Sequence, residues 1–405
     1  MQMTDAGHAP IEAPRPWDRQ AVLIVLLCFV LNMVDGMDIL ILSYIAPALQ
    51  SEWGVDTGQL GIVFSSGLAG MALGGIGLAP LADRVGRRRM IAVAMAMMAL
   101  GMVASSFAHS VTQLALIRLV VGTGIGTVLA CIAAVAARVA PPQHRNFAVG
   151  ILQGGYPIGA MITGFVTAWA LPLFGWRHMM MGAAVVSALC VPLVLAIIPA
   201  HLEADADDSP APLREVIAGP RLRNTVLLVA ATISGFMALY FITSWITKLS
   251  IAAGLAQTNA IVASAIYNFG AFVGTLMMSV IGTRFDIRKI VSNLLLAAIV
   301  VFLVFGGVHM ALPAVLFAAF IMGVTLQGGY NGMYPIAAHV YPDKVRATGI
   351  GWVFGVGRIG AFCGPLLGGW ALAQNIPLVG VFAIFCVPLF IAAMAARNIR
   401  FAHAG

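Results

Sequence analysis

The amino-acid sequence predicts an all-α membrane protein with twelve transmembrane helices in two six-helix pseudo-repeats and with both termini in the cytoplasm. Three observations lead to this fold class: the composition, the long apolar segments and an internal repeat. Of the 405 residues, 61% are hydrophobic and only 9% are charged, whereas soluble proteins carry about 25% charged residues. This composition excludes soluble enzymes, nucleic-acid-binding proteins and disordered proteins, and it identifies the lipid bilayer as the surroundings of the chain.

Twelve apolar segments are long enough to cross a bilayer, whose hydrocarbon core of about 30 Å requires roughly 20 helical residues. They lie at residues 20–44, 57–82, 90–108, 112–137, 146–171, 177–198, 222–247, 257–281, 290–308, 312–336, 346–372 and 377–396. We therefore divide the chain into a cytoplasmic N-terminal segment (1–19), an N-terminal six-helix bundle (20–198), a cytoplasmic linker (199–221), a C-terminal six-helix bundle (222–396) and a short cytoplasmic tail (397–405). The linker is rich in acidic residues and proline, a composition that does not span membranes.

Positive charges give the orientation, because Lys and Arg are retained in cytoplasmic loops. With the N-terminus inside, 18 of the 22 Lys and Arg residues fall on the cytoplasmic side. Arg177 and Lys248 lie in outer loops, and Arg118 and Arg358 lie within predicted spans. The net charge of +7 therefore reflects membrane topology and not a nucleic-acid partner. The five cysteines lie in predicted helices without paired spacing, so we expect no disulfide framework, no metal site and no cofactor.

An internal repeat relates the two halves. The segment that begins at Arg145 is matched, 201 positions later, by the segment that begins at Arg346. The matching residues are Gly150, Gly154, Gly159 and Ala160 in the first segment and Gly351, Gly355, Gly360 and Ala361 in the second. Two parallel repeats are typical of secondary transporters that bind substrate near the midplane, between halves that rock against each other. Glycines in such helices also allow close packing of the helix backbones.

Two acidic residues, Asp35 and Asp38, lie inside a predicted span. Ionisable groups cost roughly 2.5–3.5 kcal/mol at the centre of a membrane helix and are functional candidates by default. With a spacing of three residues they share one helix face, and two like charges in a low dielectric favour protonation of at least one, as a proton carrier requires. The helical rise places Asp35 and Arg118 at the same membrane depth. We predict an ion pair between Asp35 or Asp38 and Arg118 that protonation breaks or rearranges; a static salt bridge is the alternative.

Arg358 lies close to the midplane, about 18 Å along its predicted helix, and the spans of its own half contain no acid. A substrate carboxylate would pair with this buried guanidinium through two hydrogen bonds. Polar and aromatic side chains at similar depth suit a flat aromatic ring, although aromatic residues at helical spacing are also typical of packing. The predicted substrate site comprises Arg358, Tyr267, Asn268, Gln327, Tyr330, Asn331 and Tyr334, with Trp352, Gln153 and Tyr156 as weaker candidates.

The loop after the second predicted helix reads Pro80-Leu81-Ala82-Asp83-Arg84-Val85-Gly86-Arg87-Arg88-Arg89. It resembles the signature of the major facilitator superfamily, a Gly followed by Asp-Arg-x-Gly-Arg-Arg, with Ala79 in place of that first Gly. In such a loop an aspartate can cap a helix end, a glycine allows a tight turn, and arginines pair across the closed inner face. We predict a cytoplasmic gate made of Asp83, Arg84, Gly86, Arg87, Arg88, Asp286 and Arg346. A loop that merely fixes the topology is the alternative.

Two further segments resemble the aromatic acid/proton symporter family of bacterial importers. They are Asp35-Gly36-Met37-Asp38 and the stretch from Tyr341 to Gly360. One departure is Arg138, where the family pattern has Glu. The resemblance covers the whole chain. It implies a proton-coupled symporter in the inner membrane that imports a small aromatic carboxylate of the benzoate or hydroxybenzoate type by alternating access and functions as a monomer.

Other functions stay open at this point. A porter of an aliphatic organic or sugar acid is the nearest, because a midplane arginine requires only an anion. A proton-driven drug exporter would lack an anion-binding arginine at the midplane, and a nutrient receptor on a transporter fold would have a longer cytoplasmic tail than residues 397–405. Enzymatic activity is not expected, because no nucleophile with a base, metal-binding spacing or phosphate loop stands out.

Overall fold

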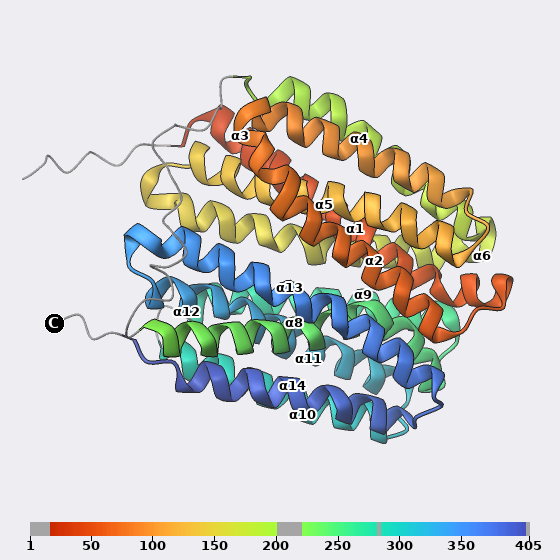
Figure 1. The fold of residues 1–405 in the computed structure, drawn as a ribbon. Coiled ribbons are helices and arrows are strands. Elements are labelled where there is room, and N and C mark those ends of the chain that lie inside the picture. Colours follow the sequence, from red (N-terminus) through yellow and green to blue (C-terminus); the bar gives the residue numbers. More distant parts are fainter. Residues whose placement is uncertain (1–16, 201–220, 282–284, 402–405) are drawn as a thin grey trace, which may run out of the picture.

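The computed structural model describes residues 17–200, 221–281 and 285–401. In these residues every regular element is helical (Figure 1), and eleven helices are long and apolar enough to cross a membrane. They contain α1 (Arg19–Trp53), α2 (Thr57–Leu73), α4 (Arg87–Ser106), α5 (Val111–Val139), α6 (Arg145–Ile197), α8 (Arg221–Ala252), α9 (Gln257–Ile281), α10 (Ile287–Gly307), α11 (Leu312–Asn331), α13 (Asp343–Ala373) and α14 (Leu378–Asn398). The spanning segments of α2 and α11 include the short helices that follow them, up to Leu81 and Val340. The predicted linker, and most of the predicted N-terminal segment and tail, lie outside the described residues.

Helix α6 covers two of the predicted spans. It runs for 53 residues, which at 1.5 Å per residue is more than twice the thickness of a hydrocarbon core. Its backbone leaves the helical conformation at Gly175, where φ is 74° and ψ is 168°. A positive φ is readily adopted by glycine. The bend therefore falls between the predicted spans 146–171 and 177–198.

Proline explains where two other predicted spans differ from the structure. The predicted span 57–82 is helix α2 followed by a π-turn (Gly74–Leu78) and a 3-10 turn (Ala79–Leu81) that contains Pro80. The predicted span 312–336 is α11 followed by the separate α12 (Met333–Val340). A proline ring clashes with the carbonyl group four residues earlier, and for Pro335 that residue is Asn331, the last of α11. Both spans are thus interrupted at their ends.

The helices form two groups, one before and one after residues 201–220 (Figure 1). Within each group the same contacts recur about 200 residues apart. The Asn32 amide on α1 donates to the main-chain oxygen of Leu152 on α6 (2.5 Å), and the Thr232 hydroxyl on α8 donates to that of Val353 on α13 (3.2 Å). Gly159 on α6 and Gly360 on α13 likewise occupy matching positions and touch the main-chain oxygens of Met33 and Ile233. The internal repeat seen in the sequence is therefore also a repeat of tertiary contacts.

Gly360 on α13 makes the shortest of these backbone contacts. Replacing it by alanine is expected to lower the free energy of unfolding by about 1–3 kcal/mol, because the new methyl group would lie 1.8 Å from the main-chain oxygen of Ile233 on α8. The matched control is Gly355→Ala on the same helix, where no atom lies within 4 Å. Thermal unfolding in detergent measures both, and a wild-type midpoint for Gly360→Ala would contradict the contact.

The two groups meet through α1 with α8, α2 with α13, and α6 with α9. The Ser43 hydroxyl on α1 donates to the main-chain oxygen of Ser244 on α8 (2.8 Å). The Ser65 hydroxyl on α2 donates to the main-chain oxygen of Phe362 on α13 (2.8 Å). Small hydroxyl side chains thus join the two groups at these two helix pairs.

Candidate functional site

Helix α1 carries both predicted acids into the interior of the N-terminal group. Asp35 and Asp38 are completely buried. Gly36 lies between them, and a Cβ atom at this position would lie 2.1 Å from the main-chain oxygen of Tyr156 on α6. The two helices therefore touch backbone to backbone beside the acids. None of the four carboxyl oxygens of Asp35 and Asp38 has a hydrogen-bond partner in the described part of the chain.

Arg118 on α5 reaches the same region, but its partner atom differs from the prediction. Its Nη2 atom donates to the main-chain oxygen of Asp38 (2.7 Å), and Nη1 contacts the sulfur of Met102 (3.2 Å). Arg118 therefore makes no described hydrogen bond to either carboxyl group, although it interacts electrostatically with Asp38, and the predicted ion pair stays a prediction. Helix carbonyl groups point towards the C-terminus and side chains tilt towards the N-terminus. An arginine that approaches from the C-terminal side of Asp38 consequently meets the carbonyl oxygen first.

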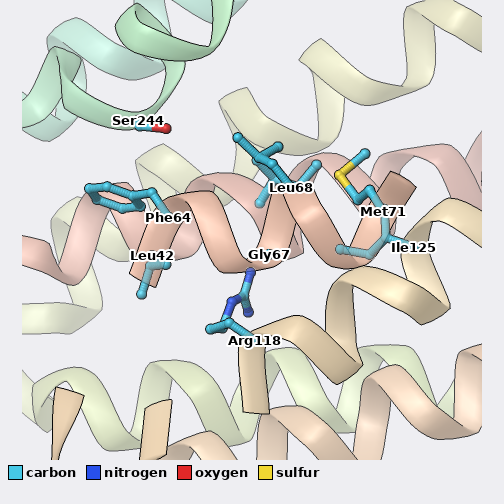
Figure 2. Close-up of a pocket in the computed structure, with 9 residues that line it drawn as sticks. Leu42, Phe64, Gly67, Leu68, Met71, Arg118, Ile125 and Ser244 are labelled. Atoms are coloured by element: carbon cyan, nitrogen blue, oxygen red, sulfur yellow. The ribbon is translucent and has the colours of Figure 1, made fainter. Parts of the chain in front are cut away.

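A cavity of about 20 Å³ lies beside Arg118, lined by residues of α1, α2, α5 and α8 (Figure 2). The Arg118 side chain points towards Gly67 of α2, and Ser244 contributes from the second group of helices. This volume accommodates about one water molecule. Arg118 is 3% exposed and its Nε atom has no hydrogen-bond partner among the described residues. The Nε–H group of Arg118 is therefore a donor available to a small ligand.

Arg358 on α13 lies in the C-terminal group. It is partly buried and interacts electrostatically with Tyr240, Tyr330 and Tyr334. Within the described residues its guanidinium has no hydrogen-bond or ion-pair partner. Arg358 thus offers an unpaired positive charge next to phenol rings, as a site for an organic anion requires.

Five aromatic rings lie together beside Arg358, and we call Phe236, Tyr240, Tyr330, Tyr334 and Phe354 the aromatic cluster. Tyr334 and Phe354 are stacked, with centroids 3.8 Å apart and planes 7° apart. Phe236 lies 4.5 Å from Tyr330 and 5.5 Å from Tyr240, measured between ring centroids. The rings come from α8, α11, α12 and α13. Offset and tilted rings at these distances attract one another and equally attract an additional ring.

Sequence reasoning missed three members of this cluster, Phe236, Tyr240 and Phe354. The sequence does contain one indication that Phe354 lies beside Arg358, because it precedes Arg358 by four residues and so shares its helix face. Phe236 and Tyr240 also lie four residues apart on α8, but nothing in the sequence indicates that this face of α8 meets Arg358. Their place depends on the packing of α8 against α13.

The other predicted substrate residues lie in varied surroundings. Asn331 donates to the Thr275 hydroxyl (2.8 Å) and accepts from Gln327 (3.4 Å), which joins α11 to α9. Asn268 donates to the Ser264 main-chain oxygen of its own helix (2.8 Å), and Tyr267 is buried near Thr243. Trp352 and Tyr156 are partly buried and Gln153 is exposed. Only Tyr330 and Tyr334 join the aromatic cluster directly; the roles of the other residues stay predictions.

The predicted cytoplasmic gate lies at the start of α4, α10 and α13. Gly86 adopts a φ of 96°, which suits glycine and allows the turn before Arg87 begins α4. Arg84 is exposed, and the side chain of Asp83 lies outside the described part of the structure. Gly86 therefore has the turn geometry expected for it.

The contacts described for the gate arginines stay within their own group of helices. Arg88 donates to the main-chain oxygen of Leu195, and Arg346 donates to that of Ala338 (3.0 Å). In the second group, Arg288 pairs with Asp286 (3.0 Å) and donates to the Ile399 oxygen (2.8 Å). The hydrogen bond from Arg288 lowers the pKa of Asp286 below its usual value. These contacts fix each arginine to its own group of helices, and the pairing of arginines across the two groups stays a prediction.

Comparisons with known proteins agree over the whole chain. The family model described as Major Facilitator Superfamily matches residues 28–308 and 251–402. The 4-hydroxybenzoate transporter PcaK of Acinetobacter baylyi is 28% identical over 94% of this chain and 91% of its own length. The gallate transporter of Pseudomonas putida is 26% identical over 95% of each chain, and the 3-(3-hydroxy-phenyl)propionate transporter of Escherichia coli is 29% identical over 94% of each.

The fold matches that of a solved structure. A bacterial homologue of the human lysosomal transporter Spinster, in an inward-facing and occupied conformation, superposes with a TM-score of 0.78 and 16% sequence identity. The match covers 96% of this chain and 100% of the other. At this level of identity the likeness shows a shared fold.

Proposed function

Because this chain belongs to the Major Facilitator Superfamily, we propose that it is a proton-coupled symporter that imports a small aromatic carboxylate by alternating access. It is a multi-pass protein of the inner (plasma) membrane. Relatives that are similar over more than nine-tenths of the chain are named as transporters of 4-hydroxybenzoate, gallate and 3-(3-hydroxy-phenyl)propionate. These three compounds share a carboxylate and a hydroxylated benzene ring.

The observation that carries the proposal is Arg358 beside the aromatic cluster. A carboxylate pairs with a guanidinium through two parallel hydrogen bonds, and aromatic rings gain about 0.5–1.5 kcal/mol per favourable ring pair beyond the burial of their surface. An aliphatic acid would satisfy the arginine but would make no ring contacts. The cluster therefore favours an aromatic acid over the aliphatic or sugar acid that the sequence left open.

Asp35 and Asp38 are the proposed proton carriers. Their burial without hydrogen-bond partners supports this role, because an unpaired carboxylate is costly to bury. A proton that enters with one monoanion moves no net charge across the membrane. The membrane potential, which is worth about 2.3 kcal/mol per charge per 100 mV, would then not assist uptake, and the pH gradient alone would drive it.

The proposal includes twelve spans, with α6 counted as two, and two six-helix bundles at residues 20–198 and 222–396. Gly175 divides α6 into segments that each suit one crossing. An even number of crossings leaves both termini on one side, and the positive charges place that side in the cytoplasm. We also propose that the protein functions as a monomer, because both candidate sites are built from a single chain.

Uptake of labelled 4-hydroxybenzoate into proteoliposomes tests the function. With an inward pH gradient and the membrane potential clamped by a potassium ionophore, we expect accumulation that an uncoupler abolishes. Benzoate and phenylpropanoids should compete at least about tenfold better than aliphatic acids of equal charge, since lost ring contacts of this size correspond to roughly that ratio. Equal competition by aliphatic acids would identify an organic acid porter, and accumulation that ignores the uncoupler would exclude proton coupling.

A further inference from the structure

Tyr156 on α6 is held in a fixed position beside Asp35. The main-chain oxygen of Tyr156 touches Gly36, where a Cβ atom would lie 2.1 Å away. The neighbouring glycines pack in the same way, since a Cβ atom at Gly155 or Gly159 would lie 2.5 Å or 1.9 Å from a main-chain oxygen of α1. These contacts prevent α6 from sliding along α1. The height of Tyr156 relative to Asp35 is therefore set by backbone packing.

The hydroxyl group of Tyr156 is buried and has no hydrogen-bond partner in the described part of the structure. The phenol interacts electrostatically with Tyr240 on α8, Tyr267 on α9, and Tyr44 and Asp35 on α1. Its surroundings thus include the acid of one group of helices and two tyrosines of the other. A buried polar group without a partner is unfavourable, so this hydroxyl is available to a partner that changes during transport.

The other ionisable side chains around Asp35 are less suited to supply a hydrogen bond. Arg118 on α5 is held by the Asp38 oxygen and by Met102. Tyr44 on α1 donates to the main-chain oxygen of Ala160 (2.8 Å). The remaining ionisable groups that interact with the acids are Asp38 itself, Cys190 on α6 and Tyr240 on α8. The Cys190 thiol is a weak hydrogen-bond donor, and Tyr240 also interacts electrostatically with Arg358. Among the groups that interact with Asp35, the Tyr156 hydroxyl is thus a buried donor without a described hydrogen-bond partner, on the helix that touches α1 at Gly36.

We propose that Tyr156 is a positioning residue that couples proton occupancy of Asp35 to substrate affinity. When Asp35 is ionised, the Tyr156 hydroxyl donates to its carboxylate. When Asp35 is protonated, the acid is a weaker acceptor, and the hydroxyl is released towards Tyr240, Tyr267 and the bound aromatic acid. Protonation of Asp35 therefore precedes tight substrate binding. This inference rests on the proposed function for its substrate, but the contact with Asp35 does not depend on it.

The first measurement needs no substrate. Infrared difference spectra between acid and alkaline pH are recorded for the full-length protein in lipid nanodiscs, and Asp35→Asn identifies the carboxyl band of Asp35. Tyr156→Phe, which removes only the hydroxyl, should shift this band. The matched control is Tyr341→Phe, because the Tyr341 hydroxyl is also buried but donates to Thr225 (3.0 Å). An unshifted band in Tyr156→Phe overturns the proposal.

The second measurement follows binding of 4-hydroxybenzoate as the pH rises through the titration of Asp35. Wild-type and Tyr341→Phe affinities should weaken by about tenfold, whereas the affinity of Tyr156→Phe should change by less than about threefold. A wild-type pH dependence in Tyr156→Phe overturns the coupling. If the wild-type protein binds no aromatic acid, the proposed function fails, while the infrared result still decides whether Tyr156 contacts Asp35.

A reciprocal measurement covers the case in which Tyr156→Phe does not fold. Asp35→Asn retains the size of the side chain, and in protein labelled with ring-deuterated tyrosine it should remove the pH-dependent shift of one tyrosine band. Retention of every tyrosine shift in Asp35→Asn would overturn the contact.

Discussion

Arg358→Ala is expected to weaken binding of the aromatic acid by about 100-fold and to abolish its accumulation in proteoliposomes. A hydrogen bond to a charged group contributes roughly 1.5–3 kcal/mol, and tenfold in affinity corresponds to about 1.4 kcal/mol. The guanidinium has no described hydrogen-bond or ion-pair partner of its own, so its removal leaves no protein group unpaired. The whole loss should therefore appear in substrate affinity, with the thermal stability of the free protein nearly unchanged.

Two further variants make the result specific. Arg358→Lys keeps the charge but loses the planar fork, so we expect an intermediate loss of about tenfold. Arg397→Ala removes an exposed arginine at the end of α14 and should transport as the wild-type protein does. Isothermal titration measures the affinities, and uptake measures transport. Transport by Arg358→Ala at the wild-type rate would contradict the anion site and favour a drug exporter.

The intramembrane charges could be found from the sequence because they are rare there. Asp35, Asp38, Arg118 and Arg358 stand out in a chain with 9% charged residues, and the cost of burying each of them makes it a candidate. The repeat was also readable, since the matching Gly159 and Gly360 make matching backbone contacts in α6 and α13. Properties that depend on position along a single helix were thus predictable.

Contacts between helices were less predictable. Helical rise gives the depth of a side chain but not the atoms that it meets, so Arg118 was assigned to a carboxylate and instead binds the main-chain oxygen of Asp38. The same limit hid Phe236 and Tyr240, whose ring contacts require the relative rotation of α8 and its neighbours. The depth of a side chain is one of its three coordinates, whereas predicting a hydrogen bond or a ring contact requires all three coordinates of both groups.

The repeat also shows how the two halves differ. The counterpart of Asp35 in the second half is Gly235, where an added Cβ atom would lie 3.2 Å from the ring of Tyr330. The counterpart of Arg358 in the first half is Pro157. One half has the acids and the other has the arginine with its rings, so the proposed proton site and the proposed anion site lie in different halves, which meet where α1 contacts α8. Coupling between the two ligands then requires the halves to move relative to each other.

Asp35→Asn and Asp38→Asn are expected to lose accumulation but to keep exchange of substrate across the membrane. A symporter that moves one proton with each anion accumulates substrate at most about tenfold for a pH difference of one unit, since both correspond to about 1.4 kcal/mol. Asparagine cannot release a proton at either face, so the accumulation ratio should fall to about one. Asp38→Asn leaves the main-chain oxygen that binds Arg118 in place, which separates the loss of the proton site from the loss of that contact.

Glu52→Gln is the matched control for these variants, because it makes the same chemical change on the same helix. The Glu52 carboxylate lies at the far end of α1, where it accepts hydrogen bonds from Trp176 (2.6 Å) and Arg177 (2.5 Å), and this variant should accumulate substrate as the wild-type protein does. Labelled substrate is followed once with an imposed pH gradient and once as counterflow without a gradient. Full accumulation by both aspartate variants would show that neither carboxylate carries the proton, whereas loss of both accumulation and counterflow would assign them to substrate binding or folding.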